Sequence, residues 1–362
     1  MKILLLIDNF GSGGAQRQMI SIAEAFKAKG MDVSFLIYDN NNFHREKVDK
    51  LGLAVHCCAS GNVISRMFRV RRYIRKGKFD AVISFMDTPN FLNNFSAIGG
   101  HKWKVVTSER SYNEAIFRNR KNRIFNLFSR FSDAIVCNSE RARRMWLGHM
   151  PDYESKLHVV YNTVLLPEME SQYIPLENGK VHIVIAASFQ SLKNPINFVK
   201  GLALLSKDEL SHLKIDWYGA RKVSGEGTTV FDTAEEMVIG NHMEDTVSLH
   251  DATSDISSLM EKADCVALFS KYEGMPNAIC EGMWLGKPII MTKVSDYDVL
   301  IDSDNGFLCD WDKPDTIASA LRSIINCDKE RLLAMGKASE RKARNLFDRE
   351  KIISEWMNII GR

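Results

Sequence analysis

Short runs of consecutive apolar residues, rich in Val and Ile, alternate along the chain with longer segments whose apolar residues recur at helical spacing. The short runs predict buried strands and the longer segments predict amphipathic helices. In the first half, strands are predicted at 2–7, 33–38, 54–57, 81–85, 104–107, 134–137 and 158–161. Helices are predicted at 15–29, 63–76, 118–131 and 140–149. Continuous apolar strands separated by helices indicate a parallel sheet that is covered on both faces.

The alternation stops at 166–180, where two prolines, mixed charges and an Asn-Gly step predict a linker. It then restarts, with strands predicted at 181–187, 214–218, 246–249, 265–269 and 288–291 and helices at 195–205, 278–285 and 316–326. We therefore expect an α/β protein with two doubly wound domains, at 1–165 and 181–345. A closing helix within 346–362 would pack back on the first domain. Such domains bind ligands at the C-terminal ends of their strands, so we expect a cleft between them.

The composition fits a soluble globular enzyme. Hydrophobic residues make up 45% and charged residues 26% of 362 residues, and no apolar run approaches the roughly 18 residues of a membrane span. The apolar residues at 3–7 are followed by Asp8, so we expect a buried strand there rather than a signal peptide. The seven cysteines are scattered and form no CxxC pair, which indicates neither a disulfide framework nor a zinc site. We expect a cytoplasmic location.

Charge is divided unevenly between the halves. Residues 1–165 hold 26 Lys and Arg against 14 Asp and Glu, a net charge of +12, whereas 166–362 carry a net charge of −9. Basic residues interleaved with apolar ones cluster at 66–78, 118–123 and 141–144. These segments are either ordinary solvated helix faces or a peripheral contact with an anionic membrane at the inner face of the plasma membrane. Nucleic acid is not expected, because no recognised binding module accompanies the charge.

Two loops are candidates for binding a ligand. The loop at 8–18, DNFGSGGAQRQ, places Gly13 and Gly14 before a helix, where backbone N–H groups could bind phosphate, although a tight structural turn is an equal alternative. Gln16 stands where a GxGxxG fingerprint needs glycine, so a dinucleotide site is not indicated. The segment at 269–290, FSKYEGMPNAICEGMWLGKPII, places Glu273 in a loop and Glu281 on the following helix. That spacing lets the two carboxylates contact two groups of one ligand.

The string EGMPNAICEGMWLGKPII resembles the nucleotide-sugar signature of family 4 of the retaining GT-B glycosyltransferases. Other segments resemble that family over nearly the whole chain, among them the N-terminal glycine loop FGSGGAQRQ, VVYNTV at 159–164, SFQSLKNP at 188–195 and DSDNGFL at 302–308. The resemblance implies a GT-B fold with two Rossmann-like domains. It implies transfer of a sugar from a nucleotide-sugar, most simply a UDP-sugar, with retention of configuration and without a metal or other cofactor.

The resemblance also implies roles for residues of this sequence. Glu281 would bind the donor ribose, Glu273 would lie against the donor sugar, and Lys193 would stabilise the leaving diphosphate. The remaining donor-binding residues would be Gly13, Gly14, Ser188, Gly274, Met275, Pro276, Asn277 and Ala278.

The chain departs from the family pattern at two places. Ser188 stands where the family usually has arginine, so Arg221 could supply the missing cation. No histidine stands in the first-domain segments near the acceptor, which leaves Asp87, Glu109 and Arg110 as the polar candidates, or as a satisfied loop network. Three DxD strings, at 296–298, 302–304 and 310–312, could hold a metal but more simply cap loops.

We therefore expect a glycosyltransferase whose acceptor is a glycan or lipid-linked oligosaccharide of bacterial surface polysaccharide, such as lipopolysaccharide. Two alternatives share the architecture: a nucleotide-sugar 2-epimerase, and a non-catalytic partner subunit. An epimerase would bind the donor but need no acceptor. Retention of Glu273, Glu281 and Lys193 argues against a non-catalytic chain.

Overall fold

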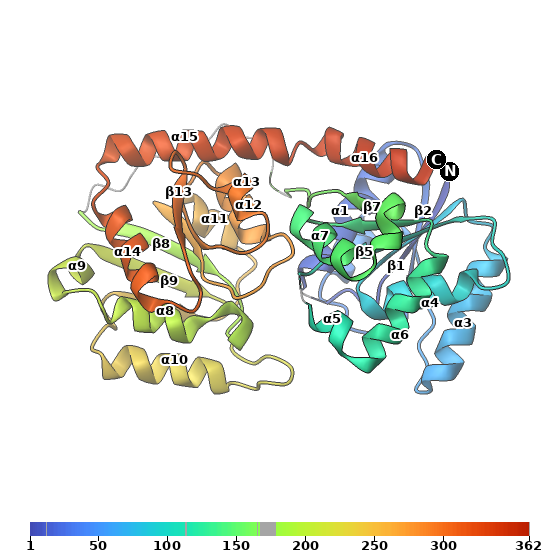
Figure 1. Ribbon diagram of the computed structural model, residues 1–362, viewed down its shortest axis with the longest axis horizontal. Helices are drawn as coiled ribbons and strands as arrows, with labels where there is room; N and C mark the ends of the chain where they lie inside the picture. The colour runs from blue at the N-terminus through green and yellow to red at the C-terminus, as the bar shows by residue number, and fades with distance from the viewer. Residues whose placement is uncertain (12, 113, 165, 167–178, 362) are drawn as a thin grey trace. The chain divides into compact units, whose positions relative to one another are not determined.

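The computed structural model describes residues 1–361 apart from 12, 113, 165 and 167–178 (Figure 1). The chain forms two compact units, one made of Met1–Thr163 with Arg349–Arg362 and the other of Val164–Asp348. Most of the linker expected at 166–180 lies outside the described residues. None of the helices in the described part of the chain is long and apolar enough to cross a membrane.

The first unit contains a seven-stranded parallel sheet in the order β3-β2-β1-β4-β5-β6-β7. Its strands are β1 (Lys2–Leu6), β2 (Asp32–Ile37), β3 (Ala54–Cys57), β4 (Ala81–Phe85), β5 (Lys104–Glu109), β6 (Ala134–Cys137) and β7 (Leu157–Val159). Its helices are α1 (Gly14–Ala28), α2 (Arg45–Lys50), α3 (Val63–Lys76), α4 (Asp87–Ala97), α5 (Ala115–Arg118), α6 (Arg120–Phe128), α7 (Glu140–His149) and α16 (Arg349–Gly361), with 3-10 turns η1 (Ser129–Phe131) and η2 (Pro151–Lys156).

The second unit contains a six-stranded parallel sheet in the order β10-β9-β8-β11-β12-β13. Its strands are β8 (Val181–Ala186), β9 (Leu213–Tyr218), β10 (Val247–His250), β11 (Cys265–Leu268), β12 (Ile289–Thr292) and β13 (Gly306–Cys309). Its helices are α8 (Pro195–Leu202), α9 (Lys207–Ser211), α10 (Thr229–Gly240), α11 (Ile256–Glu261), α12 (Asn277–Trp284), α13 (Tyr297–Leu300), α14 (Pro314–Ile325) and α15 (Lys329–Leu346), with the 3-10 turn η3 (Ser191–Lys193).

Both sheets are doubly wound, which confirms the predicted α/β class. The chain order reverses between β1 and β4 in the first sheet and between β8 and β11 in the second. At such a switch point the loops that follow the two strands diverge to opposite faces and leave a crevice at the carboxyl edge. The two candidate loops of the sequence, at 8–18 and 269–290, both follow strands that border a switch point.

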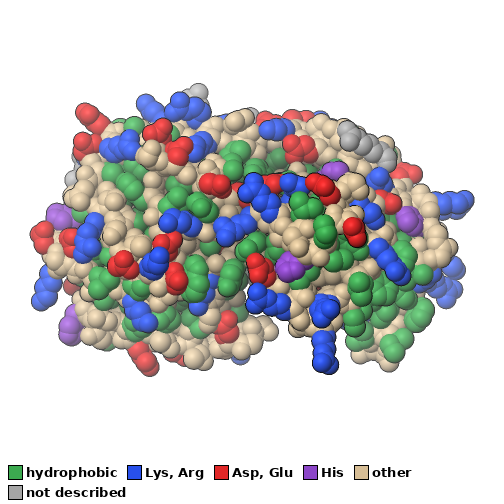
Figure 2. Space-filling model, in the orientation of Figure 1, with side chains coloured by type: hydrophobic (Ala, Val, Ile, Leu, Met, Phe, Trp, Pro, Cys, Tyr) green, Lys and Arg blue, Asp and Glu red, His purple; other side chains and the backbone are tan. Residues whose placement is uncertain are grey.

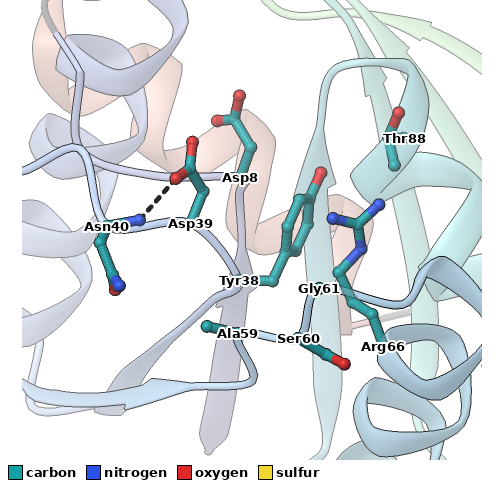
Figure 3. Close-up of a pocket in the computed structure, with 9 residues that line it drawn as sticks. All are labelled: Asp8, Tyr38, Asp39, Asn40, Ala59, Ser60, Gly61, Arg66 and Thr88. Carbon is teal, nitrogen blue, oxygen red and sulfur yellow. Dashed lines mark hydrogen bonds between the residues drawn. The ribbon is translucent and has the colours of Figure 1, made fainter.

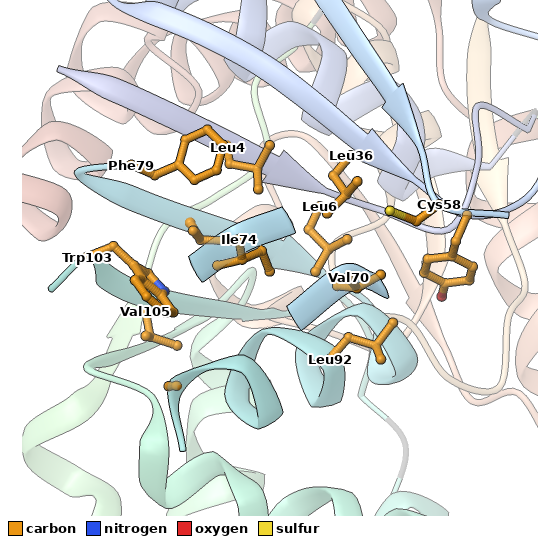
Figure 4. Packing of buried hydrophobic residues seen from close by; sticks show 13 residues of the cluster. Leu4, Leu6, Leu36, Cys58, Val70, Ile74, Phe79, Leu92, Trp103 and Val105 are labelled. Carbon is orange, nitrogen blue, oxygen red and sulfur yellow. The ribbon is translucent and has the colours of Figure 1, made fainter. Parts of the chain in front are cut away.

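Helices α3 and α4 cover one face of the first sheet and enclose the core shown in Figure 4. Leu4, Leu6 and Val82 of the strands meet Val70 and Ile74 of α3, all of them essentially inaccessible to water. The C-terminal helix α16 also belongs to this unit. Its Trp356 is 1% exposed and its ring centroid lies 6.0 Å from that of Phe85 at the end of β4.

Two of the four arginines of α3 that were expected on a solvated face, Arg71 and Arg75, also bind the end of α4. Arg75 is exposed, as expected, whereas Arg71 is half-buried. Arg71 Nη1 and Arg75 Nη1 both donate to the carbonyl of Ser96 in the last turn of α4, at 3.0 and 3.1 Å. The last carbonyls of a helix have no partner within the helix, so these guanidinium groups satisfy them and complement the helix dipole.

The approach of α12 to the second sheet depends on Gly282. A Cβ atom at this position would lie 2.8 Å from Cβ of Val266 on β11, closer than real side chains allow. The absence of a side chain therefore lets α12, which carries Glu281, lie directly against the strand that leads to Glu273.

We expect Gly282→Ala to destabilise the second unit by roughly 1–3 kcal/mol, because the added methyl overfills a packed contact. Gly240→Ala is the matched control, since a Cβ there meets nothing within 4 Å at the end of α10. That change should be neutral or slightly stabilising, because alanine favours the helix. Urea unfolding of both variants measures the difference, and equal stabilities would contradict this account of the α12 contact.

Candidate active site

The loops that follow β8 and β11 meet at the switch point of the second sheet. The first loop contains Ser188 and the turn η3, which ends at Lys193, and the second contains Glu273. Their backbones are joined directly, because the amide of Lys271 donates to the carbonyl of Leu192 at 2.8 Å. The two loops therefore form a single structural element at the carboxyl edge of the sheet.

Lys193 and Glu273, the two residues predicted to act in catalysis, form an ion pair. Lys193 Nζ lies 2.5 Å from Glu273 Oε1, and the side chains are 20% and 13% exposed. Ser270 Oγ, which the sequence analysis did not single out, donates to the same oxygen at 2.6 Å. Both bonds fall on Oε1, so Oε2 has no partner among the described residues. An ammonium group has three N–H bonds, so Lys193 retains donors for a ligand.

The segment after Glu273 leads into α12. Gly274, Met275 and Pro276 are buried, and Ser295 Oγ donates to the carbonyl of Gly274. No side chain caps the start of α12, where Asn277 and Ala278 stand in the first turn. A helix N-terminus without a side-chain cap offers backbone N–H groups and the positive end of a dipole to an anion. Figure 1 shows α12 in the same unit as β8, β9 and β13.

Glu281 lies one turn further along α12 and is only 4% exposed. Apart from Arg221, the structure thus gathers the predicted donor residues of the second half into two neighbouring loops and one helix. A buried carboxylate on Glu281, the second carboxylate oxygen of Glu273 and a cation on Lys193 could bind hydroxyl groups and a phosphate of one ligand.

Ser188 and Arg221 border this group. Ser188 Oγ accepts a hydrogen bond from Gln190 Nε2 at 2.7 Å. The loop after β9 that carries Arg221 lies beside η3, because Glu226 Oε2 accepts from both the backbone and the hydroxyl of Ser191 at 2.8 Å. Arg221 stacks on Phe231 and lies 2.9 Å from Asp251 Oδ1, so it is already engaged by an exposed carboxylate.

In the first unit, Gly13 and Gly14 lie at the start of α1, directly after the loop that follows β1. Both are exposed, and no side chain caps α1. Across the switch point, Met86 joins β4 to α4 with φ of 77°, a left-handed conformation that a non-glycine residue rarely adopts. Such strain persists where the surrounding structure imposes it, and it is frequent at ligand sites.

The acceptor-side candidates divide into two arrangements. Glu109 is 6% exposed and accepts hydrogen bonds from the amide and hydroxyl of Ser111 and from Trp146 Nε1. Burial, together with the charge of Asp87, raises the pKa of Glu109 to about 7. Asp87 is exposed, and both carboxylates border one small cavity. Glu109 is therefore held within a loop network of the kind considered as the alternative for these residues.

Arg110 points elsewhere. Its guanidinium lies 4.4 Å from the ring centroid of Phe85 and donates to Asn162 and Ser108. Burial lowers its pKa to about 10, so it remains a cation at neutral pH. The Arg110 guanidinium thus donates to other groups than those that bind the Glu109 carboxylate, although the charge of Glu109 partly offsets the effect of burial on the pKa of Arg110.

In two of the DxD strings the first aspartate is engaged with a lysine. Asp302 Oδ2 lies 2.7 Å from Lys342 Nζ, and its Oδ1 accepts from the backbone of Asp304. Asp310 pairs with Lys293 at 3.1 Å and with Lys313 at 3.4 Å. The lysines lower the pKa of both carboxylates, which are thus loop-capping and ion-paired groups.

Two family models match this chain, one over each half. The model described as glycosyltransferase family 4 matches residues 12–166, and the model described as glycosyl transferases group 1 matches residues 169–342. Together they span every named strand of the two sheets except β1, and every candidate site residue of the second unit. The chain therefore belongs to the group 1, family 4 glycosyltransferases, and it is a glycosyltransferase enzyme.

Relatives and solved structures agree with that family. A glycosyltransferase of Haemophilus influenzae is 24% identical over 371 residues, which covers 99% of each chain. The GalNAc-alpha-(1->4)-GalNAc-alpha-(1->3)-diNAcBac-PP-undecaprenol alpha-1,4-N-acetyl-D-galactosaminyltransferase of Campylobacter jejuni is also 24% identical, over 100% of this chain and 98% of its own.

The solved structures show the fold. Anabaena HepE in complex with UDP and glucose superposes with a TM-score of 0.84 at 15% identity, covering 100% of this chain and 99% of that one. The lipopolysaccharide outer core galactosyltransferase WaaB gives a TM-score of 0.76 at 15% identity, with the same coverage. The predicted GT-B fold is thereby confirmed.

The raised pKa of Glu109 predicts how the stability of the first unit depends on pH. The folded state holds this proton up to about pH 7, whereas an ordinary glutamate releases it near 4.5. The contribution of Glu109 to stability is therefore full below pH 4.5 and is lost as the pH rises to about 7. Glu109→Gln should remove this slope and gain roughly 1–3 kcal/mol relative to wild type at pH 8.

Unfolding measured at pH 5 and pH 8 tests this expectation. Glu154→Gln, at an exposed position of the same unit, is the control and should keep the wild-type slope. An unchanged slope in the Glu109 variant would show that this carboxylate is ionised in the folded protein at all these pH values.

Proposed function

We propose that this glycosyltransferase moves a sugar from a UDP-sugar to a glycan or lipid-linked acceptor of a bacterial surface polysaccharide, with retention of anomeric configuration and without a metal ion. The observation that carries the proposal is the Lys193–Glu273 ion pair at the switch point of the second sheet. The C. jejuni relative is named for an undecaprenol-linked acceptor, and HepE was solved with UDP and glucose, which supports the choice of both substrates.

The donor would bind the second unit through three contacts. Glu281, buried on α12, would accept hydrogen bonds from the ribose hydroxyls. The N-terminus of α12 and Lys193 would bind the diphosphate. Ser188, on the loop of Lys193, and Arg221, on the loop that Glu226 joins to η3, would contribute. Glu273 Oε2, which has no partner among the described residues, would accept from a hydroxyl of the sugar. Gly13 and Gly14 are the proposed N–H donors of the first unit, at the start of α1.

Lys193 would act mainly on the leaving group. When the bond from the sugar to the diphosphate breaks, negative charge grows on the phosphate oxygen, and a fixed ammonium group stabilises it. Glu273 holds that ammonium group in place, and its other oxygen orients the sugar. The acceptor would bind the first unit, and Asp87, Glu109 and Arg110 remain the proposed acceptor-side residues.

A nucleotide-sugar screen identifies the donor. UDP-, GDP- and ADP-sugars are added to the protein and the melting temperature is followed, because a ligand stabilises the state that binds it. The best donor, labelled in its sugar, is then incubated with an undecaprenyl-linked glycan extract. A transferase moves the labelled sugar permanently to the lipid, whereas a 2-epimerase would leave it on the nucleotide.

We expect Lys193→Ala to lower kcat about 10²- to 10³-fold while the KM for the donor changes little, since its interaction strengthens in the transition state. Lys271→Ala is the matched control, because Lys271 lies on the adjoining loop over the ring of Trp311 and outside the ion pair. UDP release during transfer is the readout. A variant whose KM alone rises would contradict the leaving-group role.

Activity should survive EDTA, because the proposed stabilisers of the diphosphate are Lys193 and the N-terminus of α12. The first aspartates of two DxD strings, Asp302 and Asp310, are bound to lysines instead. The assay compares turnover before and after chelation, with added Mn²⁺ as the comparison. Loss of activity that Mn²⁺ restores would revive a metal-dependent mechanism.

We also propose a peripheral contact between the first unit and an anionic membrane. The surface, here called the basic apolar face, consists of exposed residues of α3 and α6: Ile64, Phe68, Arg72, Arg120, Arg123, Ile124 and Leu127. Figure 2 shows hydrophobic side chains gathered over α3 and α6. Helix α4 lies between these helices, and rings of Phe68, Phe95, Phe91 and Phe125 join the three in an unbroken series.

Sedimentation with liposomes tests the basic apolar face. The variant Arg72→Glu/Arg120→Glu/Arg123→Glu should lose most binding to anionic vesicles, since each basic residue contributes about 1 kcal/mol near the surface. Lys207→Glu/Lys222→Glu/Lys262→Glu makes the same charge change on exposed positions of the second unit and should still bind. Wild-type binding should weaken with salt. Equal sedimentation with neutral and anionic vesicles, or none with either, would refute the contact.

A further inference from the structure

An open cavity of about 590 Å³ lies at the carboxyl edge of the first sheet. It is formed where β1, β2 and β3 end, and α3 and α4 close its other side (Figure 3). Most of the lining side chains are polar, among them those of Asp8, Tyr38, Asp39, Ser60, Arg66 and Thr88. The size suits one or two sugar rings. None of these six side chains was among the predicted site residues.

Arg66 is the least satisfied group in this wall. Its guanidinium lies 4.8 Å from the ring centroid of Tyr38, and its buried Nε has no hydrogen-bond partner. Its neighbours on α3, Arg71 and Arg75, by contrast, are bonded to carbonyls at the end of α4. Figure 3 shows the Arg66 guanidinium between Tyr38 and Thr88, beside the cavity. A donor held in place without an acceptor indicates a ligand that supplies one.

The carboxylates on the opposite side require a ligand that also donates. Asp8 Oδ1 accepts from the backbone of Asn9 and from Gln16, whereas its Oδ2 has no partner among the described residues. Asp39 is exposed and anchored by its bonds to Asn9 Nδ2 and Asn40 N. Two carboxylates against one guanidinium give the lining a net negative charge, which repels a phosphate.

We infer that this cavity binds a neutral sugar unit of the acceptor glycan. A sugar hydroxyl both donates and accepts, so it can satisfy Asp8 and Asp39 as a donor and Arg66 as an acceptor. The phosphates of a lipid-linked acceptor must then bind elsewhere. The identification of this sugar as part of the acceptor rests on the proposed function. Binding of a neutral sugar can be measured without any transfer.

The test uses methyl glycosides of glucose, galactose and N-acetylgalactosamine as probes of the full-length protein, with inorganic phosphate as the anionic competitor. Saturation-transfer NMR should detect at least one glycoside, and phosphate should not displace it. Arg66→Met keeps the side chain over Tyr38 but removes its donors, and should weaken that glycoside about 10- to 100-fold, as expected for a lost hydrogen bond from a charged group. Lys76→Met, at an exposed position of the same helix outside the cavity, should bind like wild type.

A second variant distinguishes a lost contact from misfolding. Asp39→Asn preserves the shape of an exposed side chain and should also weaken binding of the glycoside, while the circular dichroism spectrum stays unchanged. UDP affinity should be the same in wild type and in both cavity variants. Absence of glycoside binding, its displacement by phosphate, or equal binding by Arg66→Met would overturn the inference. Failure of UDP to bind wild type would instead count against the proposed function and leave this result standing.

Discussion

The ion pair between Lys193 and Glu273 is the constraint on which the second unit's site depends. It connects the loop after β8 to the loop after β11, and these strands border the switch point of the sheet. The side chains of Lys193 and Glu273 are 20% and 13% exposed. Burying either charge without an opposite charge or a hydrogen-bond partner would cost free energy. The ion pair satisfies both charges, and it leaves N–H donors of Lys193 and Oε2 of Glu273 available to a ligand. The position of α12, fixed by Gly282 against β11, then brings Glu281 to the same edge.

The sequence was sufficient to predict the fold class because the buried strands are continuous apolar runs. Elements whose burial does not depend on apolar residues were missed. Helix α4 buries Asn93 and Ser96, whose side chains bond to the carbonyls of Val82 and Leu92, so its inner face looks polar in the sequence. The predicted helix at 118–131 is in fact α5, α6 and η1, a division for which no glycine or proline gives a signal.

Most of the proposed donor residues could be singled out from the sequence, because they are contiguous in two short segments whose resemblance to a family is specific. The cavity of the first unit could not, since Asp8, Tyr38, Ser60, Arg66 and Thr88 come from separate loops and helices that only the sheet order brings together. The same limit applies to α3, where Arg66, Arg71 and Arg72 lie within seven residues of one another. Arg66 lines the cavity, Arg71 binds the end of α4 and Arg72 is exposed. The position of each arginine around the helix axis relative to α4 determines these different environments.

The central claim is that the second unit binds a nucleoside diphosphate through α12 and the loop of Lys193. Calorimetric titration of UDP into wild type, Glu281→Ala and the control Gly240→Ala tests it most directly. The account predicts a single site in wild type and in the control. It predicts about 10- to 100-fold weaker binding to Glu281→Ala, because hydrogen bonds to a charged group contribute about 1.5–3 kcal/mol. Equal affinity in all three proteins, or no binding of UDP, GDP or ADP to wild type, would contradict it.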